Sequence, residues 1–167
     1  MKNIGYLFFS MGFLLANSCQ QEGNNSIQNC CLSSADSLSI INEIIVATDN
    51  YAIANINMDF DKAANFYDSS SDFKLAENGE EYANWDSLYL TIKNAFQPLD
   101  SVNCMWGERN VIPLKPDAAT LYSRLSFRTK FQSGEVYEAT GIFTGLLIKK
   151  DGVWKSKQSH FSIDLQE

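Results

Sequence analysis

The stretch that decides the fold is TGLLIKKDGVWKSKQSHFS, residues 144–162, close to the end of the chain. Two runs that can form strands flank Asp151-Gly152, a dipeptide typical of a two-residue β-hairpin turn. The second run contains His160, the only histidine of the 167 residues. Because side chains alternate between the two faces of a strand, the register of this hairpin decides what His160 faces.

Working outward from the hairpin, the whole C-terminal part is predicted to be a four-strand meander. After Ser101 four extended runs are separated by Lys-Pro-Asp, Ser-Gly and Asp-Gly, which are turn signals. Apolar spacing predicts helices over about 37–55, 59–67 and 84–96, with a small strand that runs into a turn at Asn78-Gly79. Helices followed by a meander predict an α+β domain with the helices on one face of an antiparallel sheet.

The N-terminal residues are predicted to lie outside this domain. Residues 1–18 hold Lys2 and a short apolar run, which indicates a signal peptide rather than a membrane span. Residues 16–19, Ala-Asn-Ser-Cys, resemble a bacterial lipobox, which implies lipidation of Cys19; cleavage without a lipid is the alternative. Residues 19–33 are rich in Gln, Asn and Ser and predict a flexible tether to a domain over 34–167. Gln20 resembles the residue found in lipoproteins sorted to the outer membrane.

Composition excludes some classes of function. A net charge of -7 and a pI of about 4.7 argue against nucleic-acid binding, which needs a basic face. A hydrophobic share of 45% supports a real core. Cys104 could pair with Cys30 or Cys31, and the cysteines show no zinc spacing. No phosphate loop or nucleophile motif is found, so no cofactor is predicted.

Two-residue loops in the last two hairpins predict which side chains share a face. Counted from Asp151-Gly152 and Ser133-Gly134, one face carries Tyr122, Arg124, Phe143, Gly145, Gln158 and His160. The opposite face carries apolar residues, among them Leu125, Phe127, Ile142 and Leu146. A shift of one residue at either loop would exchange the faces of a whole strand.

The order of these elements, with Asn57-Met58-Asp59 before the second helix and DGVWKSKQSHFS at the end, resembles the NTF2-like superfamily. Within it, the SnoaL-like and DUF4440 families are the most similar, over about Leu38 to Asp164. The resemblance implies a cone, in which a bent antiparallel sheet wraps a long N-terminal helix and two shorter helices and leaves a pocket at its open end. It also implies a homodimer formed through the outer face of the sheet.

A narrower resemblance concerns a possible carboxylate site. LYSRLS, residues 121–126, and residues 144–162 are similar to the association domain of calcium/calmodulin-dependent kinase II. There the corresponding arginine, here Arg124, lines a pocket that accepts small carboxylates. The second pocket arginine of that domain falls on Gly145, so the chain departs from the pattern. Glu43 or Asp72 could instead neutralise Arg124.

Three hypotheses for the function follow. The first is an envelope-anchored lipoprotein that binds a small, partly apolar, carboxylate-bearing molecule in the cone pocket without transforming it, through Tyr51, Trp106, Tyr122, Arg124, Phe143, Gln158 and His160. The second is a lyase or isomerase that uses His160 as acid or base, with Tyr51 beside it. The third is a dimeric interaction module with a vestigial pocket. All three leave the membrane contact to the lipid on Cys19.

Overall fold

The computed structural model describes residues 32–82 and 84–164, so the predicted signal peptide, Cys19 and most of the tether lie outside the described residues. The helices are α1 (Ser34–Ile56), α2 (Phe60–Ala64) and α3 (Trp85–Phe96). The strands are β1 (Lys74–Glu77), β2 (Glu80–Tyr82), β3 (Leu99–Lys115), β4 (Ala118–Phe131), β5 (Val136–Lys150) and β6 (Val153–Asp164). The predicted order of helices followed by a four-strand meander is confirmed. No described helix has the length and apolar character needed to cross a membrane.

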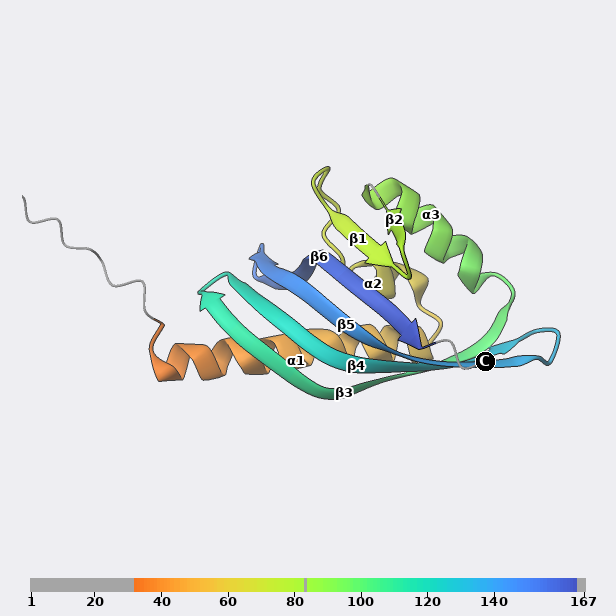
Figure 1. The fold of residues 1–167 in the computed structure, drawn as a ribbon, viewed down its shortest axis with the longest axis horizontal. Helices are drawn as coiled ribbons and strands as arrows, with labels where there is room; N and C mark the ends of the chain where they lie inside the picture. Colours follow the sequence, from red (N-terminus) through yellow and green to blue (C-terminus); the bar gives the residue numbers. More distant parts are fainter. Residues whose placement is uncertain (1–31, 83, 165–167) are drawn as a thin grey trace, which may run out of the picture.

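One curved sheet organises the molecule. Its strand order is β2-β1-β6-β5-β4-β3, with β1 parallel to β6 and every other pair antiparallel. Figure 1 shows α1 and α2 behind the sheet and α3 beside β1 and β2. The fold is therefore α+β, with a bent, unclosed sheet and the long first helix against its inner face, as predicted.

Helix α1 forms and docks for reasons that can be seen in its sequence. The Ser33 hydroxyl accepts a hydrogen bond from the backbone N–H of Asp36 and so caps the first turn. Ile40, Ile44 and Thr48 recur every four residues and are buried on one stripe. The indole N–H of Trp106 donates to the backbone carbonyl of Thr48 over 2.9 Å, which fixes the helix against β3.

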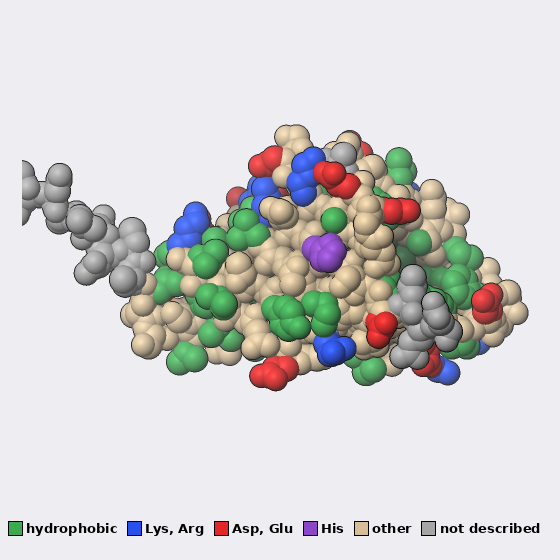
Figure 2. Space-filling view, in the orientation of Figure 1, with side chains coloured by type: hydrophobic (Ala, Val, Ile, Leu, Met, Phe, Trp, Pro, Cys, Tyr) green, Lys and Arg blue, Asp and Glu red, His purple; other side chains and the backbone are tan. Residues whose placement is uncertain are grey.

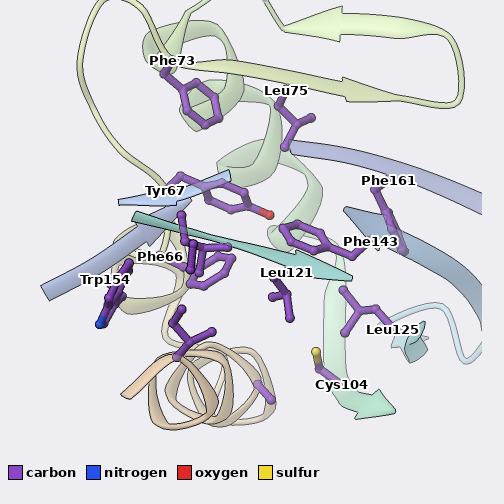
Figure 3. Packing of buried hydrophobic residues seen from close by; sticks show 14 of the residues in the cluster. Phe66, Tyr67, Phe73, Leu75, Cys104, Leu121, Leu125, Phe143, Trp154 and Phe161 are labelled. Atoms are coloured by element: carbon purple, nitrogen blue, oxygen red, sulfur yellow. The ribbon is translucent and has the colours of Figure 1, made fainter. Parts of the chain in front are cut away.

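The hydrophobic core lies between this helix and the inner face of the sheet. Figure 3 shows Leu121, Leu125, Phe143 and Phe161 projecting from the strands toward Phe66, Tyr67 and Phe73 of the segment after α2. These side chains are all less than 9% exposed, and Phe73 and Leu121 are almost fully buried. Burial on this scale is the main source of stability that the fold has.

The predicted strand register is wrong at one hairpin turn. Between β4 and β5, Lys130 pairs with Val136, whereas the two-residue loop predicted Gln132 with Glu135. The turn instead closes with the amide of Phe131 donating to the carbonyl of Glu135. This register differs by one residue from the predicted one, so the side chains of β5 exchange faces relative to β4.

A second shift of one residue follows in the last hairpin. Lys150 pairs with Val153, as predicted for the Asp151-Gly152 turn. The register then slips between Leu146 and Leu147, where β6 carries an extra residue. Such a bulge reverses the alternation of every residue beyond it.

The two shifts compensate for each other in the outer part of the hairpins. Tyr122 and His160 both pair with Thr144, so these two side chains share a face, as predicted. Phe143 and Gly145 lie on the opposite, inner face, and their predicted place beside His160 is wrong. The face that carries His160 is the outer one, turned away from α1.

Candidate functional sites

Three of the predicted pocket residues come together on the inner face of the sheet. The ring centroids of Tyr51 and Trp106 are 6.0 Å apart, and those of Trp106 and Phe143 are 5.3 Å apart. Phe66 joins the same cluster, 4.9 Å from Tyr51. These rings pack on one another. At these positions the inside of the predicted cone is therefore an aromatic core rather than a pocket.

Two buried tyrosines add hydroxyl groups to this aromatic cluster. Burial raises the pKa of Tyr67 to about 12, and burial raises the pKa of Tyr51 well above its usual value. The two hydroxyl groups are hydrogen-bonded to each other. Both side chains are therefore neutral at physiological pH and serve as hydrogen-bonding groups rather than as bases.

His160 lies on the other side of the sheet from this cluster. Its side chain is exposed on the outer face, whereas Tyr51 packs on the inner face. An acid–base pair of His160 and Tyr51 inside the cone is therefore wrong, because the sheet separates them. The physical reason is that strand alternation groups side chains on one face without determining which face the helices cover.

His160 instead lines a depression that we call the sheet hollow. It has a volume of about 750 Å³ and lies on the outer face over β4, β5 and β6, bounded by β1–β2 on one side and β3 on the other. Its lining residues are Lys74, Leu75, Ala76, Glu81, Asn110, Ile112, Thr120, Leu121, Tyr122, Thr144, Gly145, Leu146, Gln158, Ser159 and His160. Tyr122, Gln158 and His160 are thus brought together as predicted, but outside the cone.

Arg124 is exposed on the outer face and does not meet its predicted partners. It pairs across the sheet with Ile142, so it lies on the face opposite to Gly145. Glu43 binds Lys149, and Asp72 binds Lys157. The expectation that Arg124 forms a carboxylate pocket within the cone is therefore wrong.

A second depression runs along α1, and we call it the helix groove. Its volume is about 880 Å³, and its walls are α1 on one side and the β5–β6 turn with the α2 region on the other. It is lined by Ser39, Asn42, Glu43, Val46, Ala47, Asn50, Tyr51, Ile53, Ala54, Asn57, Asp59, Lys62, Asn65, Phe66, Lys149, Gly152, Val153 and Trp154. Of the predicted ligand residues, only Tyr51 lines this groove.

All charged side chains in the helix groove are paired with one another. Glu43 accepts hydrogen bonds from Lys149 over 2.7 Å and from the indole N–H of Trp154 over 2.6 Å. These two bonds lower the pKa of Glu43. Asp59 and Lys62 form a second pair at 2.6 Å. Sequence analysis did not anticipate this groove, because Glu43 on one wall and Lys149 on the other are 106 residues apart in the chain.

A buried carboxylate fastens the segment after α2 to the edge of β6. Asp68 is 2% exposed and lies 2.9 Å from Lys157 and 3.2 Å from Lys150. Burial by itself raises the pKa of Asp68, but the hydrogen bonds from Ser70, Lys157 and Lys150 outweigh it and bring the pKa to about 2. The cluster holds the wall of the core in place, and sequence analysis did not anticipate it.

The apolar patch predicted for a homodimer is only half present on the outer face. Leu125 is 3% exposed and faces the core, and Phe127 packs against the same core. Ile142 and Leu146 do lie on the outer face, because they pair with Arg124 and Thr120.

Cys104 is a free, buried thiol, and burial raises its pKa to about 12.

Solved structures share this architecture. A protein assigned as a scytalone dehydratase from Novosphingobium aromaticivorans superposes with a TM-score of 0.70 at 12% identity, over 80% of this chain and 89% of that one. An NTF2-like superfamily protein from Salmonella enterica gives 0.67 at 12% identity, over 77% and 94%. An NTF2-like protein of unknown function from Shewanella oneidensis gives 0.60 at 22% identity, over 74% and 98%. No family model and no curated protein sequence matches the chain.

These likenesses establish the class of protein. The chain has the NTF2-like fold, with a curved sheet wrapped around a long first helix. Identities of 12–22% show the fold alone, and this fold is shared by proteins assigned as enzymes and by proteins of unknown function. The function of this chain must therefore be argued from its own surface.

Proposed function

We propose that this protein binds a small, uncharged, partly apolar molecule in the helix groove and does not transform it. The observation that carries the proposal is the apolar surface left open there. Val46, Ile53 and Val153 are 57%, 53% and 53% exposed, although they line one groove. Binding pockets for small molecules are typically concave and lined by apolar side chains.

The charges of the groove favour an uncharged ligand. Glu43 is held by Lys149 and Trp154, and Asp59 is held by Lys62, so an ionic ligand would have to break an existing pair. Asn42, Asn50, Asn57 and Asn65 supply neutral donors and acceptors around the apolar floor. This replaces the earlier expectation of a carboxylate-bearing ligand, which depended on Arg124. Catalysis is left out, because both carboxylates of the groove, Glu43 and Asp59, are engaged with lysines.

The test is binding of Nile red, a neutral apolar dye, followed by fluorescence of the full-length chain. Replacing Val46 or Ile53 with Gln removes apolar contact area, and we expect each to weaken dye binding about 10-fold. Leu38→Gln is the matched control, because Leu38 is 62% exposed on the same helix but lies outside the groove. The proposal would be contradicted if the dye did not bind at all. It would also be contradicted if all three variants weakened dye binding equally.

The proposal also includes the predicted place of the protein in the cell. Cys19 carries a lipid that anchors the domain to the cell envelope, at the outer membrane, and the support for this is the resemblance of residues 16–19 to a lipobox. Cys19→Ser should then move the protein from the membrane fraction to the soluble fraction. Metabolic labelling with radioactive palmitate is the direct check, and an unlabelled wild-type protein would exclude the anchor.

A further inference from the structure

The sheet hollow gathers hydrogen-bonding side chains from four strands. Asn110, Thr120, Tyr122, Thr144, Gln158 and His160 project into it from β3, β4, β5 and β6. All six side chains can donate or accept hydrogen bonds. Figure 2 shows the histidine near the middle of this face, with hydrophobic side chains close beside it and most charged side chains toward the margins.

These six side chains are not used by the fold. Across residues 32–82 and 84–164, none of them makes a side-chain hydrogen bond to another residue. Farther along the same strands and the same face, cross-strand partners do satisfy each other. The hydroxyl groups of Ser126 and Thr140 lie 2.9 Å apart, and Arg128 binds Glu138 over 2.7 Å. The hollow thus gathers open hydrogen-bonding groups where neighbouring positions are paired.

The charged residues near the hollow leave its centre neutral. Lys74 and Glu81, on the β1–β2 side, form an ion pair at 3.8 Å. Arg124 lies on the same face but is not among the lining residues. A strongly anionic ligand such as a phosphate needs converging cationic donors, and the hollow does not offer them.

Tyr122 gives the hollow an aromatic surface. Its side chain is 49% exposed and stands on β4 directly beside Asn110 of β3 and Thr144 of β5. An exposed ring can cover an apolar ligand face while its hydroxyl group bonds to a polar edge. Ile112, which is 63% exposed, and Leu146 add apolar surface to the same hollow.

We propose that the sheet hollow binds a neutral saccharide. A sugar ring has an apolar face of C–H groups that matches Tyr122, and hydroxyl groups that both donate and accept. Those hydroxyl groups match Asn110, Gln158 and His160, which can donate and accept hydrogen bonds and stand on two strands, β3 and β6. The site is separate from the helix groove, because the sheet lies between them, so either proposal can hold without the other.

The experiment uses the single histidine as a reporter. The full-length chain is labelled in its histidine ring and titrated with maltose, lactose and N,N′-diacetylchitobiose while the His160 signals are followed by NMR. We expect at least one sugar to give a saturable shift with a Kd of about 1 mM or tighter. Tyr122→Ala and Gln158→Ala should each weaken that sugar about 10-fold, and both should leave Nile red binding unchanged.

Ser126→Ala is the matched control, because Ser126 lies on the same strand and face but bonds to Thr140 outside the hollow. It should leave the sugar affinity unchanged. The proposal is overturned if no sugar shifts the His160 signals, or if Tyr122→Ala weakens binding no more than the control does. It is also overturned if light scattering finds a dimer that Tyr122→Arg dissociates, since a second copy of the chain would then occupy the hollow.

Discussion

The two faces of the four long strands are formed by alternate residues of the same sequence, yet their side chains differ in burial and in bonding. The inner face carries Trp106, Leu121, Phe143 and Phe161, whose side chains interlock with α1 and with the segment after α2. In the sheet hollow, the outer face carries six polar side chains that make no side-chain hydrogen bond within the described residues. Stability is thus concentrated on one face, which leaves the other face free to serve recognition.

The largest expected difference between the faces is at two neighbouring residues of β3. Trp106→Ala removes the ring contacts with Tyr51 and Phe143 and the bond to the Thr48 carbonyl, and should cost about 3–5 kcal/mol of unfolding free energy. Met105→Ala, on the outer face and 57% exposed, should cost less than about 1 kcal/mol. Urea denaturation measures both, and equal losses would contradict the assignment of the faces.

The next prediction compares two glycines on opposite faces. A Cβ added at Gly141 would lie 2.8 Å from the Phe161 ring and would also overlap the Ser162 carbonyl. Gly141→Ala should therefore destabilise the protein by about 3 kcal/mol, since the backbone cannot yield easily. At Gly107 the added Cβ would meet the Arg124 side chain at 3.3 Å and the Arg124 carbonyl at 3.6 Å, so Gly107→Ala should cost distinctly less. Thermal unfolding of the pair gives the answer, and a reversed order would sink the prediction.

The buried Asp68 cluster should give a pH-dependent effect of intermediate size. Because the pKa of Asp68 is lowered from 3.8 to about 2 in the folded protein, its contribution is full above about pH 4 and is lost as the pH falls through 2. The shift corresponds to about 2 kcal/mol, at roughly 1.4 kcal/mol per pKa unit.

Urea midpoints at pH 6 and at pH 2 test this in wild type and Asp68→Asn. The two proteins should differ at pH 6 and converge at pH 2. Asp100→Asn is the control, because the Asp100–Lys130 pair is half exposed and should contribute little at either pH. A difference between wild type and Asp68→Asn that does not change with pH would mean that the charge of Asp68 is not what stabilises the segment.

The smallest expected effect is on the outer face. Tyr122→Ala and His160→Ala should change the unfolding free energy by no more than about 0.5 kcal/mol, because neither side chain makes a hydrogen bond to another residue that the structure describes. Chemical denaturation is again the measurement. A loss well above 1 kcal/mol would show that these residues stabilise the fold. The assignment of stability to the inner face and of recognition to the outer face would then be wrong.

Much of the fold could be predicted from residue patterns because those patterns are local. Ile40, Ile44 and Thr48 recur at helical spacing, and Asp151-Gly152 fits a tight turn, so helix α1 and the last hairpin were both expected. Lys150 does pair with Val153, as the turn residues require. The Ser133-Gly134 turn was misassigned by one residue, because several hairpin loops of similar length tolerate the same dipeptide.

The candidate sites could be predicted only in part. Tyr122, Gln158 and His160 were expected together and are together, because a shift at the β4–β5 turn cancels the bulge in β6. Their face was misjudged, since alternation groups side chains without saying which group the helices cover. The helix groove was missed entirely, because Val46 and Val153 meet only when α1 packs beside the last hairpin.

The sequence by itself determined the elements and their order and the grouping of His160 with Tyr122, because these depend on spacing within a few residues or across one turn. The NTF2-like fold was expected from the resemblance of that order and of residues 151–162. Only the tertiary structure decided that Phe143 is core, that His160 faces outward and that Arg124 does not face a cone pocket. The physical reason is that a strand side chain has two faces available at almost equal local energy. One bulge and the docking of α1 settle which face is buried.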